Sequence, residues 1–383
     1  MISKNIKISS SYFYKSLLKL SNVIVNKPLV PILEDFLIEI NNNKLKITTS
    51  DLSIIMYSYI DLEDNYDPIS IAIPGKILLD TLKNLPDQPI ELIIDNNKNI
   101  VNIVSKYGKY KIICDNGELF PVVNINKSSQ NIVLNGKTIL DSINNTIIVA
   151  SHDSLKPVIN SVLFEFNDNN FTAVATDIHR LIRFNTKLEN NIFQNKFVIP
   201  KRFLSLISDI IKEDSSINIY YDDKYIYFES SENDVFITTL IKDQYPDYER
   251  VIPKNYTNQL YINRLELISA LKRLTNYTNG ITFQIILKLT ENNLELVAED
   301  VNSENNGIEN IECIYKGNNL SISYNIKYLL EILQNISTDE VILEFSEPNG
   351  NNISNKSTII KPLHEPDEEI NFDILSLIMP IFM

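Results

Sequence analysis

The sequence predicts an α+β protein built from three homologous domains, each with two helices against antiparallel sheets. One landmark recurs along the 383 residues at a nearly constant interval. A strand-like run ends in an aspartate at Asp51, Asp177 and Asp300, which lie 126 and 123 residues apart. A repeat of this length matches a whole small domain and is far longer than a solenoid unit.

A second landmark repeats with the same period. A short strand-like run leads into a helix pattern at Pro74, Pro200 and Asn325, at intervals of 126 and 125 residues. Polar stretches near Ser128 and Asn258 separate the copies. The expected domains are 1–128, 129–257 and 258–383.

Each copy contains two helix patterns, with apolar residues at three- and four-residue intervals. The first helices of the copies are expected at Ser10–Ile24, Gly136–Val149 and Ile262–Asn276. The second helices are expected at Gly75–Leu85, Pro200–Lys212 and Ile326–Ile336. Pro86 and Pro200 stand at helix boundaries, where proline is tolerated.

Short alternating runs bounded by Asn, Asp and Ser lie between the helix patterns. Examples are Ile90–Asp95, Ile217–Tyr221 and Tyr225–Glu229. Such runs are typical of antiparallel strands joined in hairpins.

Composition excludes several classes of site. The chain has 8 glycines and contains neither GxGxxG nor a P-loop pattern. Cys114 and Cys313 have no CxxC partner, and the three histidines lack metal-ligand spacing, so we expect no disulfide, metal or cofactor. No apolar run is long enough for a membrane span, and no signal-peptide pattern opens the chain. We therefore expect a cytoplasmic protein.

The charge is distributed unevenly. The net charge is −14, yet the six helix patterns hold twelve basic and five acidic residues, a net of +7. The remainder of the chain therefore carries −21. Good helix propensity of Lys and Arg could produce part of this difference. Its recurrence in all three copies favours one surface that faces a polyanion.

Asp177, His179 and Arg180 stand together and suggest an acid–base site. The aspartate recurs in all three copies, however, which favours a structural turn or capping role over catalysis. An enzyme using Asp177 and His179 stays an alternative, as does a repeat scaffold that binds only proteins. The acidic stretch at 364–373 is expected to be a solvated loop.

Several motifs occur in order along the whole chain. They are Lys27-Pro28-Leu-Val-Pro31-Ile-Leu33, Ala175-Thr-Asp-Ile-His-Arg-Leu181, Phe197-Val-Ile-Pro-Lys-Arg202, Tyr245-Pro-Asp-Tyr248 with the following Glu-Arg-Val-Ile-Pro-Lys254, and Leu377-Ile-Met-Pro-Ile381. With these motifs on a threefold repeat, the chain resembles the bacterial sliding clamps, the beta subunits of DNA polymerase III.

The resemblance implies a non-catalytic processivity factor in DNA replication. Two chains of three DNA-clamp domains would form a head-to-tail homodimer, a ring with helices lining the hole. The ring would encircle double-stranded DNA without reading its sequence. It would tether the replicative polymerase, and the clamp loader and other proteins would dock through a clamp-binding peptide.

The resemblance also carries over individual residues. The partner-peptide pocket would lie between the second and third domains, at Ile159, Thr176, His179, Arg180, Leu181, Pro246, Val251, Leu377, Ile378, Met379, Pro380 and Ile381. DNA contacts would fall on Lys27, His152, Lys156, Lys201 and Arg202. The dimer interface would involve Tyr110, Ile112 and Tyr277.

A few positions depart from the family pattern. Ile178 stands where the family commonly has glycine, and Phe382 stands near a position that often holds arginine. Pro157-Val158 occupies a loop that frequently carries aromatic residues. The stretch 364–373 resembles an insertion. These departures bear on peptide preference more than on the fold.

Overall fold

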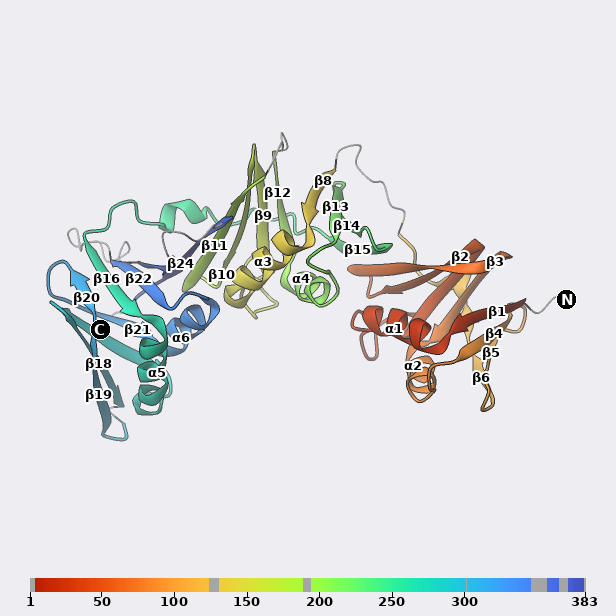
Figure 1. Cartoon of the computed structure of the whole chain (residues 1–383), viewed down its shortest axis with the longest axis horizontal. Coiled ribbons are helices and arrows are strands. Elements are labelled where there is room, and N and C mark those ends of the chain that lie inside the picture. Colours follow the sequence, from red (N-terminus) through yellow and green to blue (C-terminus); the bar gives the residue numbers. More distant parts are fainter. Residues whose placement is uncertain are drawn as a thin grey trace. The chain divides into compact units, whose positions relative to one another are not determined.

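The computed structural model describes residues 4–123, 131–188, 194–300, 302–345, 357–364 and 371–381. It divides into two compact units, which are described separately. Unit 1 comprises 1–140 and 202–240, and unit 2 comprises 141–201 and 241–383. Each unit combines antiparallel sheets with short helices (Figure 1).

Unit 1 contains two sheets. The first has four strands in the order β1-β4-β5-β6: β1 (Lys4–Ser9), β4 (Pro89–Asp95), β5 (Ile100–Val104) and β6 (Lys109–Ile113). The second has the order β2-β3-β15-β14-β13-β8, with β7 (Asp115–Asn116) beside β3. Its strands are β2 (Asp35–Ser50), β3 (Ile54–Pro74), β15 (Asp234–Thr239), β14 (Tyr225–Ser230), β13 (Ser216–Tyr221) and β8 (Ile132–Asn135).

Unit 2 also contains two sheets. The larger has the order β12-β9-β10-β11-β24-β23-β22-β16-β20, and the smaller β19-β18-β17-β21. The strands of the larger sheet are β12 (Asn195–Pro200), β9 (Ser161–Asn167), β10 (Asn170–Thr176), β11 (Arg180–Lys187), β24 (Phe372–Ile378), β23 (Thr358–Leu363), β22 (Glu340–Phe345), β16 (Asn258–Asn263) and β20 (Ile314–Lys316). Those of the smaller are β19 (Asn305–Glu312), β18 (Asn293–Asp300), β17 (Gln284–Thr290) and β21 (Leu320–Asn325).

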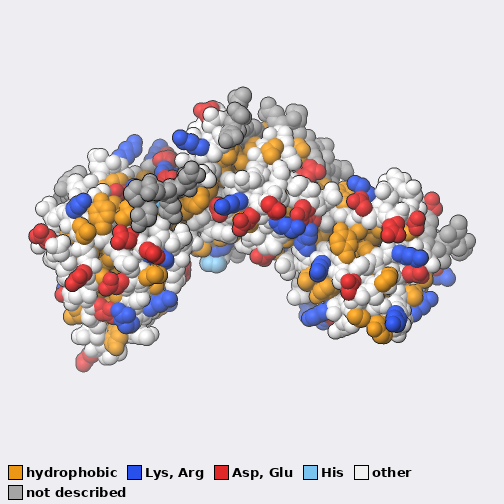
Figure 2. Space-filling model, viewed as in Figure 1, with side chains coloured by type: hydrophobic (Ala, Val, Ile, Leu, Met, Phe, Trp, Pro, Cys, Tyr) orange, Lys and Arg blue, Asp and Glu red, His pale blue; other side chains and the backbone are white. Residues whose placement is uncertain are grey.

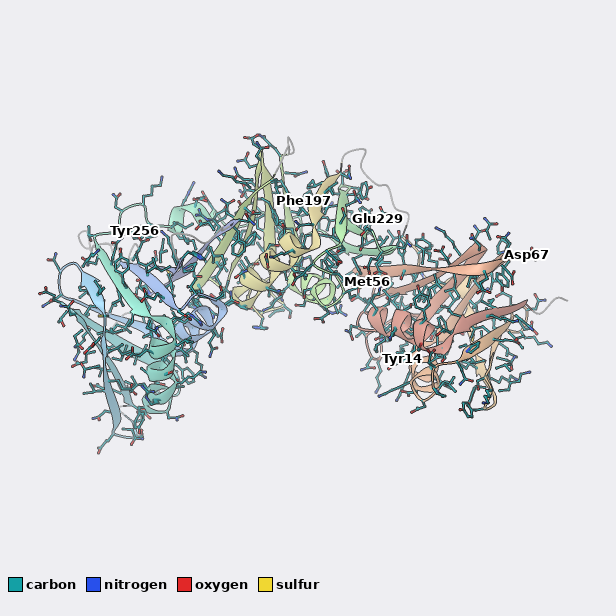
Figure 3. All side chains as sticks on the ribbon, in the orientation of Figure 1. Tyr14, Met56, Asp67, Phe197, Glu229 and Tyr256 are labelled. Atoms are coloured by element: carbon teal, nitrogen blue, oxygen red, sulfur yellow. The ribbon has the colours of Figure 1, made fainter. Side chains whose placement is uncertain are left out.

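The sheets run without interruption from one sequence repeat to the next. In unit 1, β3 pairs with β15, with Met56 opposite Phe236 (Met56 is labelled in Figure 3). In unit 2, β11 pairs with β24, with Leu181 opposite Leu377. Each junction between repeats is therefore held by a complete ladder of backbone hydrogen bonds.

The predicted helices are all present, and all six are shorter than predicted. They are α1 (Ser10–Ser21), α2 (Gly75–Lys83), α3 (Gly136–Thr146), α4 (Lys201–Ser208), α5 (Arg264–Leu274) and α6 (Ile326–Asn335). Single 3-10 turns at Ile147–Val149 and Thr275–Tyr277 follow α3 and α5, so the apolar pattern extends past the α-helix itself. The three predicted hairpin strands are confirmed to within one residue at each end.

The largest described core cluster lies in unit 2. It packs α5 and α6 against the sheets, with Leu267, Leu271, Leu329 and Leu333 fully buried. These residues stand at helical spacing, so each helix buries one stripe and leaves its opposite face open to charged side chains.

Candidate protein-binding and DNA-contact sites

The repeated aspartates cap tight turns. Asp51 Oδ1 accepts hydrogen bonds from the amides of Ser53 and Ile54, at 2.9 and 2.7 Å. Asp177 Oδ1 accepts from the amides of His179 and Arg180, at 3.0 and 2.7 Å. This arrangement satisfies the amides that start the next strand, and it confirms the predicted capping role.

The third copy holds its turn in a related way. Asp300 Oδ1 accepts from the amide of Asn302 at 3.2 Å, and Asp300 Oδ2 accepts from Ser303 Oγ at 2.6 Å. Hydrogen bonds from Ser303, Asn302 and Asn279 lower the pKa of Asp300 below its usual value, against a smaller effect of burial. The three aspartates thus share a structural function.

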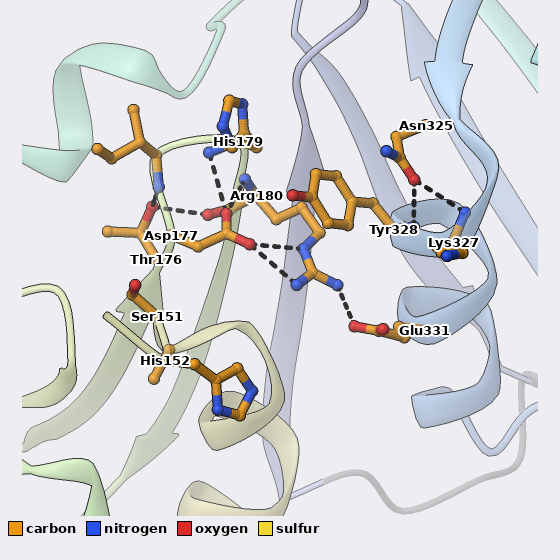
Figure 4. Close-up of polar contacts among 12 residues, drawn as sticks. Ser151, His152, Thr176, Asp177, His179, Arg180, Asn325, Lys327, Tyr328 and Glu331 are labelled. Atoms are coloured by element: carbon orange, nitrogen blue, oxygen red, sulfur yellow. Dashed lines mark hydrogen bonds and ion pairs between the residues drawn. The ribbon is translucent and has the colours of Figure 1, made fainter. Parts of the chain in front are cut away.

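Arg180 connects the Asp177 turn to α6. Its guanidinium donates from Nε and Nη2 to Asp177 Oδ2, at 3.0 and 2.9 Å, and from Nη1 to Glu331 Oε2 at 2.5 Å (Figure 4). The guanidinium carbon lies 4.2 Å from the ring centre of Tyr328, and the His179 ring stacks on the same tyrosine at 5.8 Å. Asp177 is therefore committed to Arg180 and to backbone amides, which does not support an Asp177–His179 acid–base pair.

An apolar cluster covers one face of the large sheet in unit 2, beside this turn. Its buried members come from six strands and one loop: Leu163, Val174, Leu181, Val198, Tyr245, Ile359, Leu375 and Leu377. Half-buried side chains pack against them: Val158, Ile241, Tyr248, Ile252, Tyr256 and Met379. Tyr256, labelled in Figure 3, belongs to the loop segment 241–256 that contributes most of this outer layer.

Three of the twelve predicted pocket residues belong to this cluster or pack on it. Leu181 and Leu377 are members, Met379 packs on it, and Met379 donates its amide to His179 O at 2.9 Å. Ile159 and Thr176 are buried, and each lies within two residues of a cluster residue in the sequence, namely Val158 and Val174. Pro246 and Val251 are exposed. Pro380 and Ile381 are half-buried.

Ile378 is a correction. Its side chain is fully buried among the core residues of α5 and α6, not in the cluster that holds Leu377. Successive residues of a strand point to opposite faces, so five consecutive residues cannot all line one site.

The prediction also missed members of the cluster. Val174, Leu375 and Ile359 have no motif of their own, and only strand alternation places them on the same face as Leu181 and Leu377. Tyr245 belongs to a quoted motif, and its hydroxyl donates to Val174 O at 3.3 Å. That contact fixes the loop segment over the sheet.

Two of the predicted DNA-contact residues meet in unit 2. Lys201 Nζ donates to Ala150 O at 2.7 Å and lies 3.3 Å from His152 Nε2. Burial, and then the nearby Arg180 charge, lowers the pKa of Lys201. Lys156 is exposed on the same loop as His152 and lies 3.8 Å from Asp153.

The other two predicted DNA-contact residues belong to unit 1. Lys27 is exposed, and its amide donates to Glu34 Oε1 at 2.7 Å. Arg202 forms an ion pair with Asp51 and donates to Val23 O at 3.3 Å. Arg202 is therefore already bound within the protein, although its side chain is 48% exposed.

Some basic side chains of the helices are paired or hydrogen-bonded within the protein, and others are exposed without an ion pair in the described residues. Arg264 is buried and its guanidinium donates to Leu333 O and Thr338 O, so its predicted place on a charged surface is wrong. Lys19 is paired with Asp234, and Arg273 with Glu309. Within the described residues, six exposed helix lysines form no ion pair: Lys15, Lys76, Lys83, Lys137, Lys272 and Lys327. Figure 2 shows basic and acidic side chains intermixed on one face of the molecule.

The predicted interface residues differ in exposure. Tyr110 and Tyr277 are 36% and 43% exposed, but the Ile112 side chain is buried and the adjacent Ile113 is 74% exposed. The Ile112 side chain faces the core, so its predicted place in an interface would involve its backbone.

Two remaining predictions fall partly outside the described residues, namely Phe382 and most of the acidic stretch 364–373. Of the helices in the described ranges, none combines the length and apolar character needed to cross a membrane. The same ranges hold no group of three His, Cys, Asp or Glu side chains arranged for a metal ion.

Three family models match consecutive parts of the chain. They describe the N-terminal, central and C-terminal domains of the DNA polymerase III beta subunit and match residues 4–123, 133–247 and 249–378. The chain belongs to the family of DNA polymerase III beta subunits. It is therefore built from three clamp domains and is a DNA sliding clamp, a non-catalytic processivity factor whose partners are DNA and polymerase.

Curated relatives and solved structures agree. The beta sliding clamp of Pseudomonas aeruginosa is 26% identical over 373 residues, covering 96% of each chain. That of Staphylococcus epidermidis is 27% identical over 356 residues, covering 88% of this chain and 92% of the relative. A Pseudomonas aeruginosa clamp bound to griselimycin has a TM-score of 0.91 at 22% identity, and a Bacillus subtilis clamp 0.89 at 20%, each covering all of both chains. At these identities the structural likeness shows the fold.

Proposed function

We propose that two copies of this chain close head to tail into a ring around duplex DNA, with domains at 1–128, 129–257 and 258–383. The observation that carries this proposal is a pair of unpaired sheet edges. β6 and β19 each stand at the end of a four-stranded sheet. An exposed edge presents a row of free backbone groups that another strand can pair with.

The two junctions inside the chain share one register. Ile54 pairs with Thr238 at the first junction, and Arg180 pairs with Ile378 at the second. In both cases the first residue stands three positions after the capping aspartate. In the third copy the turn after Asp300 is two residues longer, so the equivalent position is taken from the strand pairing. A third junction of equivalent strands would join β19 of one copy to β6 of another.

The register of that third junction follows from the equivalent pairs. In the second repeat, Thr176, the residue before the capping aspartate, pairs with Leu181. In the third repeat the equivalent residue, Glu299, pairs with Asn306. Asn306 is therefore equivalent to Leu181, and Asn305 to Arg180. On the other edge, Ile112 pairs with Val101 in the first repeat, and Thr238 pairs with Ile226 in the second. These pairs are equivalent, so Ile112 takes the position of Thr238. Asn305 is thus proposed to pair with Ile112 of a second copy through the backbone, which places Gly307 opposite Tyr110.

Side chains at the two edges are complementary. A Cβ atom on Gly307 would lie 2.8 Å from Leu274 Cδ2 and 3.2 Å from Tyr277 Cγ, so this position lies against both residues. The proposed register therefore brings Tyr110 of one copy to Tyr277 of the other. β6 exposes Lys109 and Lys111, whereas acidic residues occupy or precede β19 at Glu304, Glu309 and Glu312. Opposite charge favours head-to-tail association.

An ion pair accompanies each internal junction. Arg202 at the start of α4 bonds Asp51, and Glu331 of α6 bonds Arg180 beside Asp177. Lys76 stands two residues after Pro74 as Arg202 stands two after Pro200, and it is exposed and unpaired in the described chain. We therefore expect Lys76 of one copy to pair with Asp300 of the other.

Charge exchange tests the ring. Lys76→Asp and Asp300→Lys should each weaken the dimer, measured by sedimentation equilibrium, because each leaves like charges in contact. The double variant should recover dimerisation, since a head-to-tail dimer places both positions in every interface. Lys83→Asp, the same charge change two turns along α2, is the control and should leave dimerisation near wild type. No recovery in the double variant would contradict the pairing.

Partner proteins are proposed to dock on the apolar cluster of unit 2 through a short peptide. A groove-binding peptide is held by a few apolar side chains that pack on an apolar surface. Leu181, Leu377 and Met379 contribute to such a surface next to His179. The clamp of Pseudomonas aeruginosa has been solved with griselimycin bound. Met379→Asp should abolish polymerase capture on an affinity column, whereas Leu119→Asp, an exposed change in unit 1, should not.

DNA is proposed to contact Lys27, His152, Lys156, Lys201 and Arg202, together with the free helix lysines. Contacts of this kind neutralise phosphates without reading bases, so binding should fall steeply as salt rises. Lys156→Ala should reduce the slope of log affinity against log salt by about one. An unchanged slope would exclude Lys156 from the DNA path.

A further inference from the structure

Asparagine followed by glycine is a dipeptide prone to spontaneous deamidation, because glycine has no Cβ atom to keep its backbone nitrogen away from the asparagine side chain. The chain contains five such pairs, whose asparagines are Asn116, Asn135, Asn279, Asn306 and Asn349. Asn349 lies outside the described residues. The reaction needs a glycine backbone that can move, and this requirement separates the other four pairs.

Three of the four glycines are held in place. Gly136 donates its amide to Ser215 O at 2.7 Å. Gly307 is paired with Ala298 inside β19. A Cβ atom on Gly117 would lie 2.5 Å from backbone atoms of β3, so this glycine is packed against the strand. None of these backbones can turn toward the preceding side chain without breaking contacts of the fold.

Gly280 differs from the other three glycines. It is exposed in the loop between the 3-10 turn Thr275–Tyr277 and β17. No atom lies within 4 Å of its Cβ position, and no hydrogen bond within the described part of the chain uses its amide. The Gly280 nitrogen is therefore free to approach the Asn279 side chain.

Two backbone amides point at the side-chain oxygen of Asn279. Its Oδ1 atom accepts from the amides of Ile281 and Thr282, at 2.9 and 3.4 Å. Donors in this arrangement stabilise the negative charge that develops on the oxygen when a nucleophile attacks Cγ. The nitrogen that would leave, Nδ2, donates to Asp300 Oδ1 at 3.2 Å. The loop thus orients the side-chain amide for attack.

We propose that Asn279 is a site of spontaneous deamidation. Hydroxide removes the proton of the Gly280 nitrogen, which attacks Asn279 Cγ and forms a cyclic imide. The bond from Cγ to Nδ2 breaks, and Nδ2 takes a proton from water and leaves as ammonia, which restores the hydroxide. Water then opens the imide at either carbonyl and leaves aspartate or isoaspartate. One water is consumed for each ammonia released, with no change of oxidation state.

The product places a new negative charge against Asp300. The carboxylate at position 279 would face the Asp300 carboxylate, which now accepts a hydrogen bond from Asn279. Like charges in contact disfavour the ionised form of both groups and weaken the structure that holds them together. Because Asp300 holds the turn after β18, deamidation should loosen that turn.

The proposed ring would leave this loop open to water. Leu29, Leu155 and Ile281 stand at intervals of 126 residues on the equivalent loops of the three repeats, and each is at least 86% exposed. The first two stay exposed although both internal junctions are formed. The accessibility of Asn279 in a ring rests on the proposed function, whereas the reaction itself needs only the loop.

Peptide mapping by mass spectrometry tests the site in the full-length protein, incubated native or in urea. In the native protein, deamidation should accumulate at Asn279, and faster at pH 9 than at pH 7, because hydroxide generates the nucleophile. Asn116, Asn135 and Asn306 are internal controls in the same digest. They should react at least about tenfold more slowly than Asn279 when native, because their glycines cannot reach the attack geometry, and at comparable rates in urea.

Two variants separate the reaction from its consequence. Gly280→Ala should slow deamidation about tenfold and keep the fold, since its Cβ atom meets open space. Asn279→Asp fixes the charge of the product and should lower the urea midpoint at pH 8. Asn276→Asp, at an exposed position on the preceding turn, is the control and should leave the midpoint near wild type.

Native protein in which Asn279 is as protected as the three packed asparagines would overturn the proposal, and so would an unchanged rate in Gly280→Ala. Deamidation at Asn279 with a wild-type midpoint in Asn279→Asp would overturn only the loosening of the Asp300 turn. Both readouts are made on the chain itself, so failure of the Lys76–Asp300 pairing would count against the ring and leave this site standing.

Discussion

Asp35 is a buried carboxyl group that lies near two other acidic side chains. Its side chain is 5% exposed and its Oδ2 atom has no hydrogen-bond partner. Burial, followed by repulsion from Asp115 and Glu34, raises the pKa of Asp35 to about 7. Near neutral pH the Asp35 carboxyl of the folded protein is therefore close to the midpoint of its titration, with other acidic groups beside it.

Asp35→Asn should stabilise unit 1 at high pH. Because the folded pKa is raised, the folded state binds the proton more tightly than the unfolded chain does. Wild-type stability therefore falls as pH rises between about 4 and about 7. The neutral variant escapes this loss, so its advantage should grow over that range to on the order of 2 kcal/mol and then level off. Urea unfolding at pH 4.5 and pH 8 measures it, and equal differences at both pH values would contradict the account.

Arg180 is the residue on which the turn, α6 and the rim of the apolar cluster depend. Its side chain is 7% exposed and pairs with two carboxylates. Arg180→Met should leave Asp177 nearly buried without its cation and lower the free energy of unfolding by about 2–4 kcal/mol. The exposed Lys156–Asp153 pair is the control, and Lys156→Ala should cost less than about 0.5 kcal/mol in the same urea titration. A small loss at Arg180 would mean that the network is not structural.

At the scale of elements, α3 begins where two backbones touch. The Gly136 amide donates to Ser215 O at 2.7 Å, and a Cβ atom at this position would lie 1.9 Å from Lys212 O. The obstacle is backbone and cannot rotate away.

Gly136→Ala should therefore displace the start of α3 and lower the free energy of unfolding by about 2–4 kcal/mol. Gly280→Ala is the matched control, because no atom lies within 4 Å of its Cβ position. That variant should stay within about 0.5 kcal/mol of wild type. Tyrosine fluorescence during urea unfolding measures both variants. Equal midpoints would contradict the close contact between Gly136 and the Lys212 carbonyl.

The elements could be predicted well from local pattern, and their surroundings could not. The start of α1 at Ser10 follows from its apolar spacing and polar N-cap, but its end at Ser21 falls short of the predicted Ile24. The partner of Lys19 is Asp234, 215 residues away, and no local pattern indicates it. The family resemblance alone places Ile112, and motif position alone places Ile378, whereas strand alternation turns both side chains toward the core.

At the scale of the whole molecule, charge and repetition act together. The chain carries −14 overall, yet six exposed helix lysines remain unpaired in the described residues. In the proposed ring these lysines would face the DNA, while the acidic remainder of the chain repels polyanions. Two internal junctions with one register leave β6 and β19 as free edges for a third, and a second copy of the chain would supply it.

Retention on circular DNA tests this account most directly. The protein is loaded onto a nicked plasmid by its cognate loader with ATP, separated from free protein by gel filtration, and the plasmid is then linearised. A closed ring that slides should stay bound to the circle and be lost from the linear DNA. Equal retention on circular and linear DNA would contradict a topological link and indicate ordinary surface binding.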